Sequence, residues 1–124
     1  MPKTQVVLYQ KANGSVPLLD WLDKLPKRAQ VKCLARIERL AEEGHALRRP
    51  EADYLRNEIY ELRIGLQGIH YRILYFFHGR VAAVLSYGVN KERRVPPKQI
   101  DTAVRRMNEF QANPEAHTFK DQQP

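Results

Sequence analysis

The clearest pattern in the chain is a run of three apolar segments of strand length between residues 59 and 88. They read IYELRIGL, IHYRILYFF and RVAAVLSYG, and their Ile, Val, Leu, Tyr and Phe residues are typical of half-buried strands. The breaks between them, Gln67-Gly68 and the three residues from His78, are short and contain glycine, as hairpin connections do. The pattern predicts three consecutive antiparallel strands.

Before this run, the pattern predicts one strand and two helices. Residues 5–10 alternate their apolar side chains between two faces, which indicates a first strand. Ser15 and Pro17 mark the start of a short helix that Pro26 ends. Residues 27–43 carry apolar side chains at three- and four-residue steps, so we predict a longer amphipathic helix whose arginines and lysines mostly face solvent.

The remaining segments complete the predicted fold. Residues 51–57 read as a polar approach to the sheet, with no element predicted, and residues 98–111 show the periodicity of a last helix. Residues 113–124 are polar and aperiodic, which indicates a flexible C-terminal tail. We therefore predict a single α+β domain over residues 1–112, in the order β-α-α-β-β-β-α.

We expect the elements to form a small, mostly antiparallel sheet with helices on both faces. The first strand joins one edge of the sheet, the helical hairpin covers one face, and the C-terminal helix shields part of the other. The end of that second face should stay open, with Arg72 facing outward.

Charge points to a polyanionic partner. The 124 residues include 21 Lys and Arg against 14 Asp and Glu, a formal net charge of +7, which favours nucleic acid or an acidic protein.

The apolar runs are too short to span a bilayer, and the first ten residues lack the apolar core of a signal peptide. The single Cys33 cannot form an internal disulfide. We expect a cytoplasmic protein without membrane association.

Two strand arginines are the main candidates for chemistry. If the first two strands of the run pair through Gln67-Gly68, Arg63 and Arg72 could lie close together, and two guanidinium groups suit a phosphate between them. The alternative is that Arg63 pairs with Glu61 and Arg72 packs along its strand. His70 shares a face with Arg72 and could titrate near neutrality.

Other motifs add little. The histidines and Cys33 lack metal-ligand spacing, and neither a glycine-rich phosphate loop nor a Ser-His-Asp arrangement is present in the sequence, so we expect no metal and no cofactor. Cys33 reads as a packed small side chain. Tyr87, at the end of the last strand, could be a core aromatic, a base-stacking surface or a phenol near the phosphate.

The same strands carry a family resemblance. The Tyr-x-Leu-Arg segment ending at Arg63 and the Tyr-Arg-Ile-Leu-Tyr segment at residues 71–75 resemble the RelE/HigB superfamily of toxin–antitoxin toxins, in particular its phage-derived HigB-like branch. The likeness continues through Gly88, a lysine-containing loop, a proline and a last helix carrying Arg106. It spans about residues 5–110 and implies a RelE-like fold.

The resemblance implies an endoribonuclease that cuts messenger RNA, often on the ribosome, and that a helix-turn-helix antitoxin encoded nearby neutralises. It assigns Arg63 and Arg72 to stabilising the phosphate and the transition state. The general acid and base stay open among Glu61, His70, Lys91 and Tyr87, and the residues expected to bind RNA are Arg93, Arg94 and Lys98.

Two other classes of function stay open. Members of the HigB-like branch carry two consecutive lysines where this chain has Lys91 and Glu92. A ParE-like toxin that binds DNA gyrase without cutting RNA would fit the incomplete acid–base set, and an inactive RNA- or antitoxin-binding module would fit the acidic Glu92.

Overall fold

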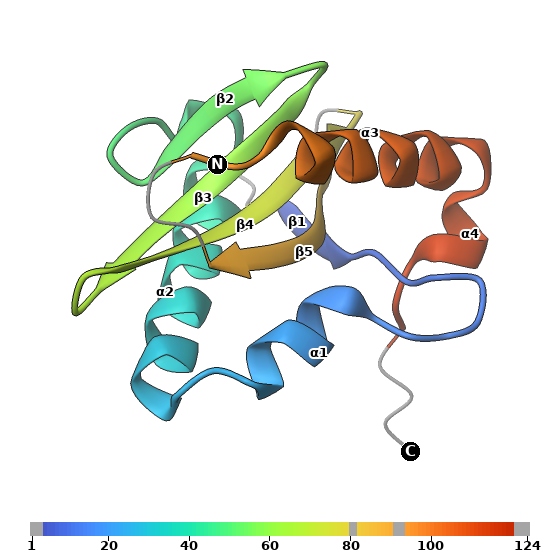
Figure 1. Cartoon of the computed structure of the whole chain (residues 1–124). Helices are drawn as coiled ribbons and strands as arrows, with labels where there is room; N and C mark the ends of the chain where they lie inside the picture. Colours follow the sequence, from blue (N-terminus) through green and yellow to red (C-terminus); the bar gives the residue numbers. More distant parts are fainter. Residues whose placement is uncertain (1–3, 80–81, 91–93, 121–124) are drawn as a thin grey trace.

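The computed structural model describes residues 4–79, 82–90 and 94–120 of the chain. Figure 1 shows the elements along the chain: β1 (Gln5–Leu8), α1 (Pro17–Asp23), α2 (Lys27–Glu43), the short 3-10 helix η1 (Gly44–Ala46), β2 (Ala52–Arg56), β3 (Ile59–Leu66), β4 (Ile69–His78), β5 (Ala82–Asn90), α3 (Pro97–Ala112) and α4 (Pro114–His117). The predicted α+β class is confirmed.

The five strands form one sheet in the order β1-β5-β4-β3-β2. β3, β4 and β5 are successive antiparallel neighbours, as predicted, and both predicted hairpins are present. Gln67 and Gly68 at the first turn have φ values of 52° and 79°, as two-residue hairpins require. β1 joins the edge of β5 in parallel, and the chain between these two strands contains the helices α1 and α2 and the strands β2, β3 and β4.

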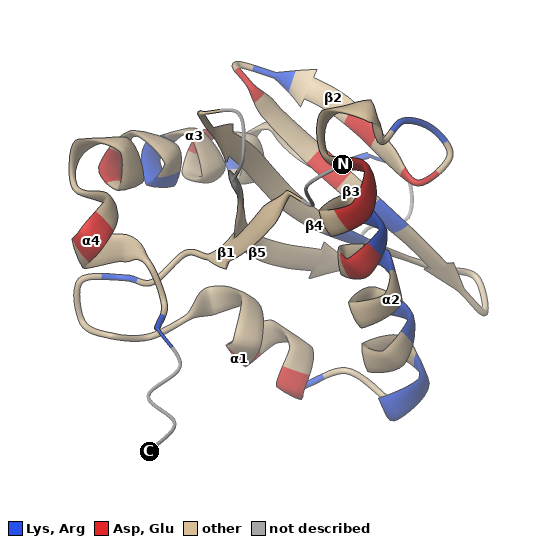
Figure 2. Ribbon diagram, turned by 180° about the vertical axis from the view of Figure 1, so that it is seen from behind, with Lys and Arg blue, Asp and Glu red and all other residues tan. Residues whose placement is uncertain are grey.

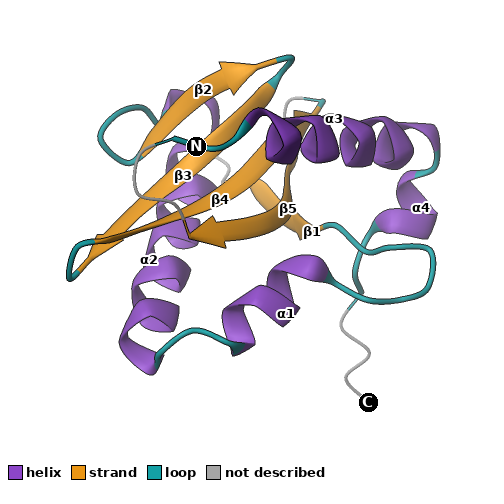
Figure 3. Ribbon diagram, viewed as in Figure 1, coloured by secondary structure: helices purple, strands orange, loops and turns teal. Residues whose placement is uncertain are grey.

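The helices cover the sheet from both sides. Figure 3 shows α3 in front of the strands and α2 behind them. Leu18 of α1 and Leu40 of α2 are buried in the core on one face of the sheet, whereas α3 buries Met107 and Phe110 in the core on the other face. A Cβ atom at Gly88 of β5 would lie 2.3 Å from the Trp21 ring of α1, so only glycine leaves room for this contact.

Residues 51–57, for which we predict no element, contain β2, which pairs with β3 at the edge of the sheet. Its turn into β3 contains no glycine, and Asn57 and Glu58 adopt φ values of 51° and 67°. Asp53 and Arg56 are charged residues of the kind that edge strands often carry. They interrupt the apolar pattern from which a strand is predicted.

The predicted flexible tail also needs correction as far as Lys120. Asn113 caps α4 by accepting a hydrogen bond from the amide of Ala116. Beyond α4, the amide of Gln10 donates to the carbonyl of His117 at 2.8 Å, and the amide of Phe119 donates to the carbonyl of Leu8 at 2.9 Å. The segment therefore docks along the chain at and just after β1, while residues 121–124 lie outside the described part.

Candidate functional site

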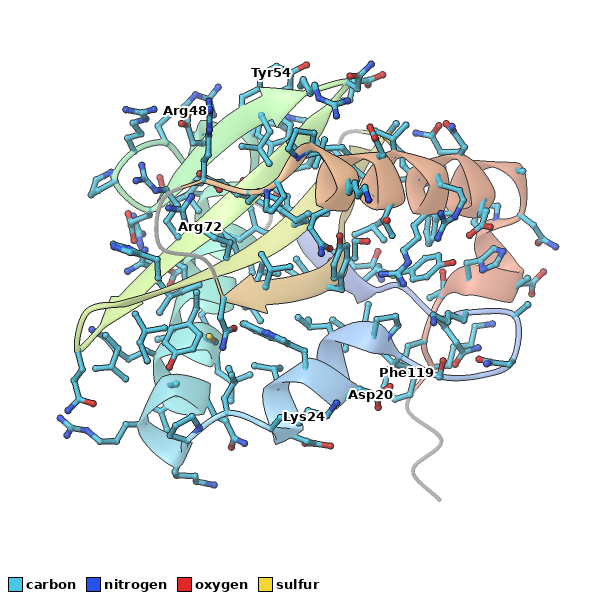
Figure 4. The ribbon with its side chains drawn as sticks, viewed as in Figure 1. Asp20, Lys24, Arg48, Tyr54, Arg72 and Phe119 are labelled. Atoms are coloured by element: carbon cyan, nitrogen blue, oxygen red, sulfur yellow. The ribbon has the colours of Figure 1, made fainter. Side chains whose placement is uncertain are left out.

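The register of the β3–β4 hairpin places Arg63 directly opposite Arg72. Side chains alternate along strands, so Glu61 and Arg63 share a face of β3, and that face is the one against which α3 packs. α3 covers the part of β4 that carries Leu74 and Phe76. In Figure 4, Arg72 lies on the part of β4 beyond the N-terminal end of α3. The predicted proximity of the two arginines is confirmed.

Glu61 holds the two guanidinium groups together. Its Oε1 accepts a hydrogen bond from Nη1 of Arg72 at 2.6 Å, and its Oε2 lies 3.8 Å from Nε of Arg63. A carboxylate between two cations removes the repulsion that would otherwise drive them apart. Arg72 consequently lies inward, with 4% of its side chain exposed, and does not face outward as we expect from the sequence. Arg63 keeps 33% of its side chain exposed.

A pocket of about 280 Å³, here called the arginine pocket, opens beside this pair; its walls are Arg36, Pro50, Arg63, Ile64, Gly65, His70 and Arg72. His70 is exposed and stands on the same strand as Arg72, which agrees with the predicted neighbourhood of these residues.

The third arginine of the pocket, Arg36, comes from α2. It donates a hydrogen bond to the backbone carbonyl of Arg63, and its Nε lies 3.7 Å from Oε2 of Glu51. The helical periodicity assigns this residue to a solvent-facing surface, but α2 packs on β3 and directs the side chain to the sheet. Figure 2 shows Lys and Arg positions along α2 and on the strands beside it. Only this packing brings Arg36 to the pocket.

The neighbouring edge strand adds a second ion pair. Asp53 of β2 is the register partner of Glu61, and its Oδ2 accepts a hydrogen bond from Nη2 of Arg49 at 2.7 Å. The Arg49 guanidinium holds the pKa of the Asp53 carboxyl below its usual range, and the positive charge of Arg63 acts in the same direction. Across the strands, Asp53 is therefore opposite Glu61 and Arg63 is opposite Arg72, and the described lining of the arginine pocket contains three arginines and no acidic residue.

Tyr87 lies outside the described walls of the arginine pocket. Its hydroxyl donates to the backbone carbonyl of Gln99 on α3 at 2.7 Å. Burial raises the pKa of this phenol to about 12. Its ring lies 4.6 Å from the guanidinium carbon of Arg106. Of the three roles that the sequence leaves open, the structure therefore favours a packed aromatic beneath α3.

The predicted RNA-binding residues are partly described. Lys91 and Arg93 lie outside the described residues. Arg94 is exposed and lines a shallow pocket of about 350 Å³ with Tyr54 and Arg56 of β2, and Lys98 is exposed in the first turn of α3. These two cations belong to the entry of α3 and not to the walls of the arginine pocket.

Other chemistry finds little support in the described part of the chain. There, no group of three or more His, Cys, Asp or Glu side chains could hold a metal ion. Cys33 is fully buried on α2, and burial raises the pKa of its thiol to about 11, so a reactive thiolate is unfavourable. Within the same residues, no helix is long and apolar enough to cross a membrane.

Comparison with known protein families assigns the chain to one of them. It belongs to the family described as phage-derived protein Gp49-like (DUF891), whose model matches residues 20–108. The match begins within α1 and includes all of the sheet except β1, so it contains the arginine pocket. The family is toxin-like and related to RelE, and such a family suggests an antitoxin partner. No curated protein matches the chain.

Proposed function

We propose that this Gp49-like protein is the toxin of a type II toxin–antitoxin system, of the HigB-like branch, and that it cleaves messenger RNA. The observation that carries the proposal is the pair of opposed arginines at the wall of a pocket that also contains His70. A pocket with several guanidinium groups suits a phosphodiester, because each group offers a planar fork of donors to phosphate oxygens.

The proposed reaction needs no metal or cofactor. The 2′-oxygen of a ribose attacks the adjacent phosphorus while the bond from phosphorus to the 5′-oxygen of the next nucleotide breaks. The products are a 2′,3′-cyclic phosphate and a 5′-hydroxyl. Negative charge grows on the nonbridging oxygens in the transition state, and Arg63 and Arg72 stabilise it. Glu61 positions both arginines through its two carboxylate oxygens.

We assign the two proton transfers of this reaction to His70 and Lys91. We assign His70 to take the proton from the 2′-hydroxyl, because it is exposed at the pocket and a neutral imidazole nitrogen can accept a proton. The 5′-oxygen needs a proton as it leaves. Lys91, which follows the last residue of β5, is our candidate donor, since Val89 and Asn90 of β5 pair with Arg72 and Tyr71.

The substrate in this proposal is messenger RNA on the ribosome, in the cytoplasm. Arg93, Arg94 and Lys98 would contact its backbone, and the net charge of +7 would draw the protein to the polyanion. A helix-turn-helix antitoxin would neutralise the toxin by covering this basic surface.

Mapping of transcript ends after induced expression tests the proposal. Arg63 is the better residue to change, because its partial exposure lets Arg63→Gln fold where a change at buried Arg72 leaves Glu61 uncompensated. Wild type should create new ends within translated regions, and Arg63→Gln should reduce them about a hundredfold, as loss of one transition-state donor does. Arg28→Gln, the same change at an exposed position of α2, serves as the matched control.

The same experiment separates the other two classes of function. Growth arrest without new transcript ends would replace the ribonuclease by a ParE-like toxin that binds gyrase. No arrest would indicate an inactive binding module. Cleavage by Arg63→Gln at the wild-type level would contradict the role of the arginine pair.

A further inference from the structure

One guanidinium nitrogen of a buried arginine on α3 has no hydrogen-bond acceptor among the described residues. Arg106 is 9% exposed, and its guanidinium carbon lies 5.5 Å from the ring centroid of Tyr9 and 4.6 Å from that of Tyr87. Its Nη1 atom is buried without a hydrogen-bond partner among the described residues, and the Glu109 carboxylate is an acidic group that acts on its charge. An arginine stays charged even when buried, so a guanidinium nitrogen without an acceptor is costly here.

Arg106 also forms part of the wall of a separate pocket of about 340 Å³, here called the C-terminal pocket, where α3 meets α4 and the loop after β1. Figure 1 shows these three segments side by side at one end of the molecule. Its lining consists of Tyr9, Lys11, Ala12, Asn13, Arg105, Arg106, Glu109 and His117. Three cations face one carboxylate, and that carboxylate already accepts the Tyr9 hydroxyl at 2.7 Å. The pocket has a surplus of positive charge.

We propose that the C-terminal pocket is a second anion site, distinct from the arginine pocket, and that it binds the phosphate group of a nucleotide. A bound phosphate would place acceptor oxygens at the wall that Arg106 forms, while Lys11 and Arg105 add charge from the exposed side. The guanidinium carbon lies over the rings of both Tyr9 and Tyr87, and these contacts restrict where the charge can move. The alternative is that Arg106 serves packing alone, and it predicts that phosphate has no effect at this end of the molecule.

The test is a titration of the whole protein with inorganic phosphate at constant ionic strength, followed by the imidazole NMR signals of His117 and His70. The two signals report the C-terminal pocket and the arginine pocket separately, because each histidine lines one of them. We expect the His117 signal of wild type to shift with saturation. Arg106→Met should weaken phosphate binding at His117 about tenfold or more, and Lys11→Gln should weaken it by a smaller factor.

Arg63→Gln is the matched control and should leave the His117 response unchanged, while weakening any response at His70. Because the His117 and His70 signals respond independently, a negative result for the second anion site can be told apart from a negative result for the proposed ribonuclease function. An unshifted His117 signal in wild type, or a response in Arg106→Met equal to wild type, would overturn the second site. If Arg106→Met does not fold, the double variant Lys11→Gln/Arg105→Gln decides, since both side chains are exposed.

Repeating the titration with adenosine monophosphate and a short single-stranded oligoribonucleotide distinguishes the sources of the phosphate. Equal Arg106-dependent shifts with phosphate and the mononucleotide indicate a free ligand. An Arg106-dependent affinity for the oligonucleotide that exceeds both indicates that an RNA strand occupies the site.

Discussion

At the scale of single residues, Glu61 determines how the arginine pocket is built. It is 3% exposed, and its two carboxylate oxygens face Arg72 and Arg63. The pair of Glu61 and Arg72 is stabilising only while both charges are present, because removal of either one leaves the other buried without compensation. Because Glu61 positions both arginines, we expect substitutions at Glu61 or at either arginine to lower the stability of the fold.

Glu61→Gln should lower the free energy of unfolding by about 3 kcal/mol, the scale of a broken buried ion pair. Urea unfolding followed by circular dichroism measures this change. The double variant Glu61→Gln/Arg63→Gln should recover part of the loss. A neutral amide then replaces the Arg63 guanidinium, so the charge repulsion between Arg63 and Arg72 is removed. Equal stability of Glu61→Gln and wild type would contradict the role of Glu61 as the bridging charge.

At the scale of elements, a second carboxylate ties α2 to the start of β2. Both oxygens of Glu51 accept hydrogen bonds from Arg39, at 2.9 Å from Nε and 3.0 Å from Nη2. The Arg39 hydrogen bonds hold the pKa of Glu51 below its ordinary value of 4.5. A carboxyl group with a lower pKa in the folded state adds stability above its unfolded pKa and loses it as the pH falls through the folded value.

The free energy of unfolding should therefore fall as the pH decreases below about 4.5, and Glu51→Gln should show a shallower decrease than wild type. Urea unfolding at intervals from neutral to acidic pH measures the slope. Glu38→Gln, an exposed change on the same helix, is the control and should keep the wild-type slope. A slope for Glu51→Gln equal to that of wild type would show that this contact does not stabilise the junction.

The elements also show how far sequence alone predicts this fold. The β3–β4–β5 meander follows from short glycine turns and apolar strands, and its register brings Arg63 to Arg72. β2 escapes prediction because an edge strand carries charged residues and its turn uses Asn57 and Glu58 at positive φ. Local periodicity describes one element at a time, so a residue such as Arg36 becomes part of the site only when α2 packs on β3.

At the scale of the whole molecule, the two pockets lie on different parts of the chain. The arginine pocket takes its walls from α2, β3, β4 and the loop before β2, whereas the C-terminal pocket takes its walls from α3, the loop after β1 and α4. The contacts that place α4 join residues more than a hundred positions apart, as in the hydrogen bond between Gln10 and His117. A prediction from local pattern therefore reads this segment as a tail.

Deletion of residues 113–124 tests whether the arginine pocket is independent of the C-terminal segment. The truncation removes the ring stacking of His117 on Tyr9, at 5.4 Å between centroids, and two backbone hydrogen bonds to the chain around β1. We expect a loss of about 1–3 kcal/mol in the free energy of unfolding, from the net value of those bonds. The positions of RNA cleavage should stay as in wild type, because the walls of the arginine pocket are retained. Deletion of residues 121–124 alone is the matched control, and a truncated protein as stable as this control would show that α4 does not support β1.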